Sequence, residues 1–204
     1  INVGCNEIGV SLVAEGPLEF CSGGGVDLVA TGSGGISPYT YKFFRDGNLI
    51  TPTSGNKYRA AVAGFYTAIA TDSKECASNS SNGLTVTVNA NPGTPAITAN
   101  PTAVCANSTG NQASGPAGAT SYAWVITSGG TITSGASAQT VTYTAAATGP
   151  VRLELTVTNA SGCSAKGTAD VQVNANPATP AITANPTAVC ANSTGNQASG
   201  PAGA

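Results

Sequence analysis

Hydrophobic and polar side chains alternate along several short stretches of this 204-residue chain. The alternation is clear in residues 84–88 (LTVTV) and 151–157 (VRLELTV). A period of two residues is typical of β-strands with one buried face. Turn-forming pairs such as Gly-Gly, Ser-Gly, Asp-Gly and Asn-Pro separate these stretches, and helical periodicity is absent. The pattern predicts an all-β chain built of short strands.

Two of the predicted strands carry aromatic side chains. Residues 38–43 (PYTYKF) and 121–126 (SYAWVI) place large apolar groups at alternate positions, so that these groups share one face. We expect this face to line the core, with Trp124 in the middle of its domain; a platform on which sugars stack is the alternative. Later strands around 66–70 and 151–157 are expected to form the opposing sheet. This arrangement predicts two-sheet sandwiches of the immunoglobulin type.

The chain contains an internal repeat with a period of 85 residues. Residues 89–119 recur at 174–204 with a single change, Ala178 in place of Gly93. A more divergent copy precedes them, and both copies close with Asn-Ala-Asn-Pro. Repeats of this kind are typical of linear arrays in which each unit contacts only its neighbours.

The repeat divides the chain into tandem sandwiches. We predict that residues 1–14 are the terminal strands of a preceding repeat, 15–91 the first complete repeat, 92–176 the second, and 177–204 the start of a third. The connecting Asn-Ala-Asn-Pro segments each hold two prolines within seven residues, so we expect semi-rigid linkers. The sequence is interpreted as a window on a longer array.

Six cysteines follow the repeat. The register predicts one disulfide inside each complete sandwich, at one end of it: Cys21 with Cys76, and Cys105 with Cys163. Cys5 and Cys190 have no partner in this scheme, because each belongs to an incomplete repeat; a bond between Cys5 and Cys21 is the alternative. Disulfides persist in oxidising compartments, so the pattern predicts an exported, extracellular protein.

Composition narrows the classes of function. Charged residues make up 8% of the chain and histidine is absent, which excludes imidazole bases and imidazole metal ligands. A net charge of −2 gives no basic surface for nucleic acid. Apolar runs are much shorter than the ~20 residues of a membrane-spanning helix, and the aspartates are too scattered for a calcium site. We predict no catalytic residue, no cofactor or metal, no nucleic-acid partner and no membrane span in this sequence.

Charge is concentrated in the first repeat. Residues 15–88 hold eleven charged side chains, whereas residues 89–173 hold four. Ordinary surface solubility explains this difference. The alternative hypothesis makes the first repeat a contact module, whose candidate contact surface consists of Phe44, Arg45, Lys57, Arg59 and Phe65.

Motifs in both repeats resemble known families. Residues 34–41 (GGISPYTY) and 63–72 (AGFYTAIATD), followed by Cys76, resemble the repeat of the giant surface adhesins used for gliding by bacteria of the Bacteroidota. Residues 122–124 (YAW) and 151–163 (VRLELTVTNASGC) are similar to the PKD-like modules of the same class of secreted proteins. The resemblance implies that the second repeat is a PKD-like sandwich in a surface-exposed, rod-like array exported by the type IX route.

Two positions depart from these families. Phe43 and Phe44 stand where the adhesin repeat usually has Trp-Ser, and the second repeat lacks the Gly-Asp-Gly turn of typical PKD domains. With the resemblance, the predicted function is a structural and adhesive stalk segment of a long cell-surface filament, serving attachment or gliding motility. Its predicted partners are neighbouring repeats and a surface, such as a polysaccharide. The alternative is a set of accessory or sugar-binding modules of a secreted polysaccharide-degrading enzyme.

Overall fold

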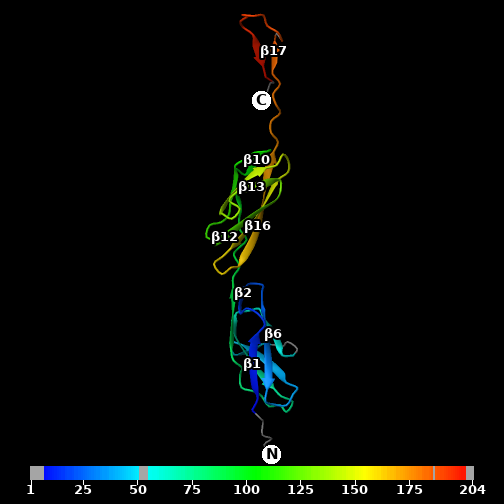
Figure 1. Cartoon of the computed structure of the whole chain (residues 1–204), viewed down its shortest axis with the longest axis vertical. Coiled ribbons are helices and arrows are strands. Elements are labelled where there is room, and N and C mark those ends of the chain that lie inside the picture. The colour runs from blue at the N-terminus through cyan, green and yellow to red at the C-terminus, as the bar shows by residue number, and fades with distance from the viewer. Residues whose placement is uncertain (1–6, 51–54, 186, 201–204) are drawn as a thin grey trace, which may run out of the picture.

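The computed structural model of the chain describes residues 7–50, 55–185 and 187–200 (Figure 1). These residues form eighteen strands, β1 to β18, and no helix. The all-β prediction is therefore confirmed. The strands gather into two sandwiches arranged end to end along the long axis, with a hairpin beyond the second (Figure 1). Among the described residues, no helix is long and apolar enough to cross a membrane.

The first domain consists of two sheets. The smaller sheet has the strand order β1-β3-β6, with β1 at Gly9–Ala14, β3 at Val26–Ser33 and β6 at Lys57–Ala60. The larger sheet has the order β2-β8-β7-β4-β5, with β2 at Glu19–Cys21, β8 at Leu84–Asn89, β7 at Gly64–Thr71, β4 at Thr40–Arg45 and β5 at Asn48–Ile50. Both sheets contribute buried side chains to one core: Leu12, Val26, Leu28, Ala30, Phe43, Ala60, Tyr66, Ala68 and Val86.

The first strand of this domain corrects the prediction for residues 1–14. β1 pairs antiparallel with β3 of the first domain, and Leu12 is buried in the first domain's core. The strand is therefore not the end of a preceding repeat, while residues 1–6 lie outside the described residues. Alternation along a six-residue strand shows which face is buried, but it does not show to which domain the strand belongs.

The second domain is also a two-sheet sandwich, with four strands in each sheet. One sheet has the order β13-β14-β11-β9, with β13 at Gly130–Ser134, β14 at Thr140–Ala145, β11 at Asn111–Ser114 and β9 at Thr98–Asn100. The other has the order β10-β16-β15-β12, with β10 at Ala103–Cys105, β16 at Ser164–Asn174, β15 at Val151–Thr158 and β12 at Ser121–Ser128. Its core holds Val104, Ala113, Trp124, Val141, Tyr143, Ala145, Val151, Leu153, Leu155, Val157, Val171 and Val173.

The aromatic strands face the core, but the sheet assignment predicted from them is wrong. Phe43 and Trp124 are each 4% exposed, and the Trp124 indole nitrogen donates a hydrogen bond to the Ala138 carbonyl at 2.9 Å. The later apolar strands, β7 and β15, are direct antiparallel neighbours of β4 and β12 in the same sheets, rather than members of the opposing sheets. Alternation fixes the buried face of a strand, whereas long-range pairing decides its sheet.

The hairpin beyond the second domain copies the local structure of β9 and β11. β17 (Thr183–Asn185) pairs with β18 (Gln197–Ser199) through Ala184↔Ala198, as Ala99 pairs with Ala113 in the second domain. The side-chain amide of Asn196 donates to the Ser193 carbonyl, as Asn111 does to Ser108. The near-identical sequence therefore forms the same turn and the same strand register in both places.

Candidate functional site at the interdomain junction

A disulfide joins the two domains. Cys21, the last residue of β2, is bonded to Cys163, which directly precedes β16. Their Cα atoms lie 5.6 Å apart, although their sequence separation is 142. We call this region, formed by the end of β2, residues 89–95 and the turn at 159–163, the interdomain junction. Because disulfides persist in oxidising compartments, this bond indicates an exported, extracellular protein.

The predicted pairing inside each sandwich is wrong, and the strand register gives the reason. β10 runs parallel to β16, so that Cys105 lies beside Asn174, at the end of β16. Cys163 precedes Ser164, at the beginning of the same strand. The eleven steps from Cys163 to Asn174 span about 35–37 Å at 3.2–3.4 Å per residue, whereas disulfide-bonded Cα atoms lie within about 7 Å. The two cysteines of a sandwich are therefore at opposite ends of it.

The other cysteines differ in state. Cys105 and Cys190 are free and exposed, so the predicted bond at Cys105 is absent and Cys190 is unpaired as expected. Cys76 is disulfide-bonded, but not to Cys21, whose partner is Cys163. The prediction for Cys5 lies outside the described residues.

The turn that presents Cys163 is fixed by a side chain. The Asn159 side-chain oxygen accepts hydrogen bonds from the backbone nitrogens of Ser161 and Cys163, at 3.1 and 3.0 Å. Asn and Asp are favoured in such turns because a short side chain can accept from the backbone two and four residues on. Gly162 adopts a φ of 77°, which is easiest for glycine. We call residues 159–163 the cysteine turn of the second domain.

The first domain has a cysteine turn of the same design. Asp72 takes the place of Asn159, and its Oδ1 accepts from the backbone nitrogens of Lys74 and Cys76 at 2.9 and 3.0 Å. Glu75, with a φ of 64°, stands where the second domain has glycine. Asp72 also accepts at Oδ2 from the Ile36 nitrogen at 3.1 Å. Both domains therefore present a cysteine from the same place in the fold.

The linker is held from both sides. The Asn91 side-chain amide donates to the Ser22 carbonyl at 3.1 Å, which ties it to the first domain. From the second domain, the Asn159 amide donates to the Ala90 carbonyl at 2.9 Å. Further on, the Pro95 carbonyl packs so closely on Gly167 that a Cβ there would collide with it. Only residues 92–94 remain between these anchors, and they include a proline.

A shallow groove of about 410 Å³ lies where this linker meets the second domain. Proline, glycine, alanine, threonine, valine and asparagine line it, and none of these side chains titrates. Across the described residues, no three His, Cys, Asp or Glu side chains are placed to hold a metal ion. The arrangement at the junction therefore offers mechanical linkage and packing.

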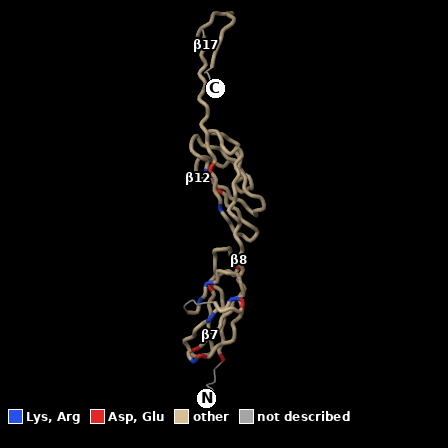
Figure 2. The backbone as a smooth tube through the Cα atoms, turned by 180° about the vertical axis from the view of Figure 1, so that it is seen from behind, with Lys and Arg blue, Asp and Glu red and all other residues tan. Residues whose placement is uncertain are grey.

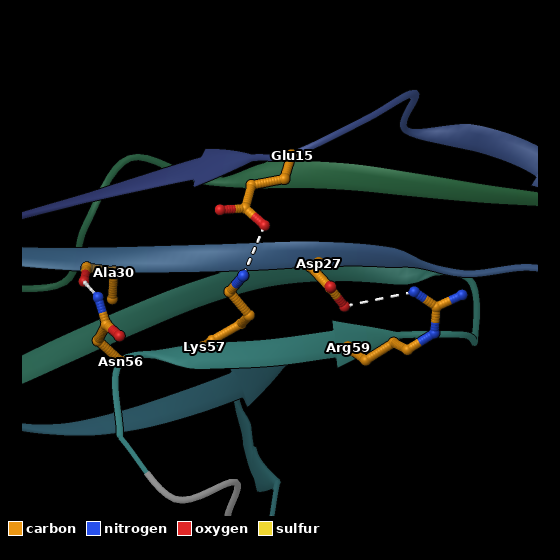
Figure 3. Close-up of polar contacts among 6 residues, drawn as sticks. All are labelled: Glu15, Asp27, Ala30, Asn56, Lys57 and Arg59. Carbon is orange, nitrogen blue, oxygen red and sulfur yellow. Dashed lines mark hydrogen bonds and ion pairs between the residues drawn. The ribbon is translucent and has the colours of Figure 1, made fainter.

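The candidate contact surface of the first domain is divided between its two sheets. Lys57 and Arg59 lie on β6, where they pair with Glu15 at 2.6 Å and Asp27 at 3.4 Å (Figure 3). Phe44, Arg45 and Phe65 lie on β4 and β7 of the other sheet. Phe65 is 49% exposed.

The structure therefore does not bring the five predicted contact residues together. The two cations of β6 are engaged with Asp27 of the neighbouring strand β3 and with Glu15, which directly follows β1, and this accounts for them as surface ion pairs.

The four charged residues of the second domain are also paired with one another. Arg152 lies 3.9 Å from Asp170, and Lys166 lies 2.6 Å from Glu154, across the neighbouring strands β15 and β16. Most of the charge otherwise lies in the first domain (Figure 2). The second domain thus has an almost neutral surface outside these two pairs.

The cysteine turn of the first domain makes stability depend on pH. The hydrogen bonds that Asp72 accepts, first that from the Ile36 nitrogen, hold the pKa of its carboxyl below its ordinary value of 3.8. A lowered folded-state pKa stabilises the fold above the unfolded pKa, and this contribution is lost as pH falls through the folded pKa. Asp72→Asn should therefore destabilise the first domain at pH 7, with a smaller difference from the unchanged chain below pH 3.8. Thermal melts followed by amide signals of β7 measure this; an equal difference at both pH values would contradict it.

Comparisons with known proteins found one family match and several distant structural likenesses. A search of curated proteins found no match to the chain. Among solved structures, the fibronectin(III)-like modules of Clostridium thermocellum CbhA align with a TM-score of 0.39 and 16% identity, over 80% of this chain and 94% of that one. Murine CEACAM1b aligns with a TM-score of 0.34 and 11% identity, over 82% and 100%.

A third structure is the Bacteroides ovatus protein SGBP-B in complex with a mixed-linkage heptasaccharide, with a TM-score of 0.29, 16% identity, and 80% and 47% coverage. At such TM-scores, none of the three likenesses bears on ligand or activity. The family comparison is more specific. Immunoglobulin-like and PKD-like sandwiches are typically non-catalytic modules. Residues 90–173, which cover the second domain except for the last residue of β16, match the PKD-like domain family.

Proposed function

We propose that this chain is a stalk segment of a long, repetitive cell-surface filament that serves attachment. The observation that carries the proposal is the disulfide between Cys21 and Cys163, which joins two consecutive domains covalently. A bond of this kind adds little to a module that acts alone. It makes a chain of modules resist separation when force is applied along its length.

The junction supports the same conclusion. Residues 92–94 are the only unanchored part of the linker, and the disulfide forms a second covalent connection beside it. Two connections at one junction restrict bending more than one flexible linker does. The two domains lie end to end along one axis (Figure 1), so that a stiff junction makes a rod.

The surface composition suits a spacer. The second domain exposes mainly small polar and apolar groups, and its four charges are internally paired. Its nearly identical continuation at 174–204 indicates that the same module is used repeatedly. We propose that such arrays carry an adhesive part away from the cell, and that the type IX route of gliding bacteria exports them.

Antibody labelling of intact producing cells tests this function. Fab fragments raised against the 204-residue chain should label unpermeabilised cells at a distance from the envelope and should reduce their attachment to surfaces. The stalk proposal requires both results. Label that is confined to the culture medium, or that needs permeabilised cells, contradicts it.

A second candidate function rests on the outer face of the larger sheet of the first domain. Phe65 is 49% exposed there, and Leu49 of β5, which pairs with Phe44, is 57% exposed. Exposed aromatic groups can stack on sugar rings, so an accessory sugar-binding module is the alternative. This alternative predicts that the chain is retained on insoluble polysaccharide. Retention should be lost in the double variant Phe44→Ala/Phe65→Ala and kept in the double variant Lys57→Ala/Arg59→Ala.

A further inference from the structure

We infer that Cys105 is one half of a second interdomain disulfide, whose other half is the cysteine of the cysteine turn in the domain that follows residues 92–176. The free thiol of Cys105 is then a covalent docking site for the next module. Repeated along an array, such bonds join every domain to its successor. The inference concerns covalent assembly and does not require the array to be adhesive.

Cys105 occupies in the second domain the position that Cys21 occupies in the first. Cys21 ends β2 and lies beside Asn89 of the parallel strand β8, while Cys105 ends β10 and lies beside Asn174 of the parallel strand β16. The next residue donates its backbone nitrogen to that asparagine carbonyl at 2.8 Å in both domains. The first of these two cysteines is bonded to the following domain.

The exit from the second domain is also built like the first junction. Asn176 donates its side-chain amide to the Ala106 carbonyl at 3.2 Å, as Asn91 does to Ser22 at 3.1 Å. The linker that follows repeats the first linker except for Ala178. Cys105 is exposed and lies on β10, at the end of the second domain that faces the hairpin (Figure 1). The second linker should therefore place the next domain beside Cys105, as the first linker places the second domain, with Cys163, beside Cys21.

The partner side of the bond is a general feature of these domains. Both described domains carry a cysteine turn in which an Asn or Asp side chain orders the backbone nitrogen of the cysteine. Cys163 uses this turn to reach the preceding domain, and Cys76 is disulfide-bonded without using the Cys21 of its own domain. A third domain with the same turn would present its cysteine to Cys105.

The chemistry is ordinary thiol–disulfide exchange with a small disulfide as the oxidant. The Cys105 thiolate attacks one sulfur of oxidised glutathione, which forms a mixed disulfide and releases one glutathione thiolate. The thiolate of the next domain's cysteine then attacks the Cys105 sulfur and releases the second. Two protein thiols are oxidised to one disulfide, and one glutathione disulfide is reduced to two thiols.

An extended chain tests the inference. Residues 1–204 are followed directly by a second copy of residues 120–176, which completes a third domain from the chain's own sequence. After refolding with oxidised and reduced glutathione, free thiols are alkylated and the disulfides are mapped without reduction. Cys105 should be found bonded to the appended copy of Cys163. Its alkylation should fall about tenfold or more relative to the unextended chain, because the two thiols are held at high effective concentration.

Matched variants separate this bond from other pairings. In the extended chain, Cys105→Ser should leave the appended copy of Cys163 alkylatable, whereas Cys190→Ser should leave the new bond intact. A bond between Cys190 and the appended cysteine would overturn the inference, since those two belong to one domain.

A second extended chain provides an independent test in case the first one does not fold. Here residues 180–204 are replaced by a copy of residues 8–91, which carries the cysteine turn of the first domain. Cys105 should then be bonded to the copy of Cys76. If Cys105 stays fully alkylatable in both extended chains, the inference is wrong. Antibody labelling of cells can fail while this bond forms, so the two proposals fail separately.

Discussion

Stretching a single molecule between its ends should give a contour length that is greater by roughly 470–510 Å in reductant than in oxidising buffer. The Cys21–Cys163 bond removes the segment between its cysteines, a sequence separation of 142, from the path that carries the force. Each residue contributes about 3.3–3.6 Å when fully extended, which gives the expected difference. In oxidising buffer, only residues outside the bond can lengthen. Optical-tweezer or force-microscopy traces to full extension measure this directly.

Three variants assign the effect to this bond. Cys105→Ser should keep the whole difference, because Cys105 is free in the structure. Cys76→Ser should keep it as well, because the Cys21–Cys163 bond remains. Cys21→Ser/Cys76→Ser removes the two bonded cysteines among the described residues of the first domain, so it should reach the greater length in both buffers. Equal lengths for the unchanged chain in the two buffers would contradict an interdomain bond.

Replacing Cys163 with serine should lower the stability of both domains. The Cys163 sulfur lies 3.9 Å from the Asn89 carbonyl oxygen, and Cys21 lies beside Asn89 in the paired strands β2 and β8. While one domain stays folded, the bond therefore restricts the unfolded chain of the other as a loop closure would, between Cys21 and the region of Asn89 in the first domain and between Asn89 and Cys163 in the second. For loops of about 70 residues the chain-entropy model gives about 4 kcal/mol. For domains of this size that corresponds to a Tm lower by about 15 °C or more.

Separate probes can follow the two domains. Trp124 is the only tryptophan, so its fluorescence reports the second domain, and amide exchange on β3 and β7 reports the first. Cys105→Ser is the matched control, since it removes a free and exposed thiol, and it should leave both transitions unchanged. If Cys163→Ser lowered the Tm of the second domain alone, the bond would act within one domain, and the junction described here would be wrong.

Much of the local structure followed from the sequence. The alternation of residues 84–88 and 151–157 predicted strands, and these residues lie in β8 and β15. The aromatic pattern placed Phe43 and Trp124 in the cores, because a large apolar side chain at alternate positions has few other places to go. The repeat at 89–119 and 174–204 predicted one local structure in two places, and the two hairpins share one strand register.

The alternation of hydrophobic and polar residues could not predict which strands pair within each sheet. A strand buries the same face whichever sheet it joins, so alternation could not tell that β7 lies beside β4, or that β1 belongs to the first domain. The five candidate contact residues were grouped because they are charged or aromatic residues of the first repeat. The folded chain distributes them over two sheets, because the chain crosses from β5 to β6 of the smaller sheet and returns to β7 of the larger one.

By itself, then, the sequence determined an all-β array of repeated, cysteine-containing domains with stiff proline linkers, since these properties depend on local pattern and on comparison of the chain with itself. Only the tertiary structure decided which cysteines meet. The parallel pairing of β10 with β16 puts Cys105 and Cys163 at opposite ends of one sandwich, too far apart to bond. The end-to-end arrangement of the domains brings Cys163 to Cys21 instead, and so converts a predicted stabiliser of single domains into a link between them.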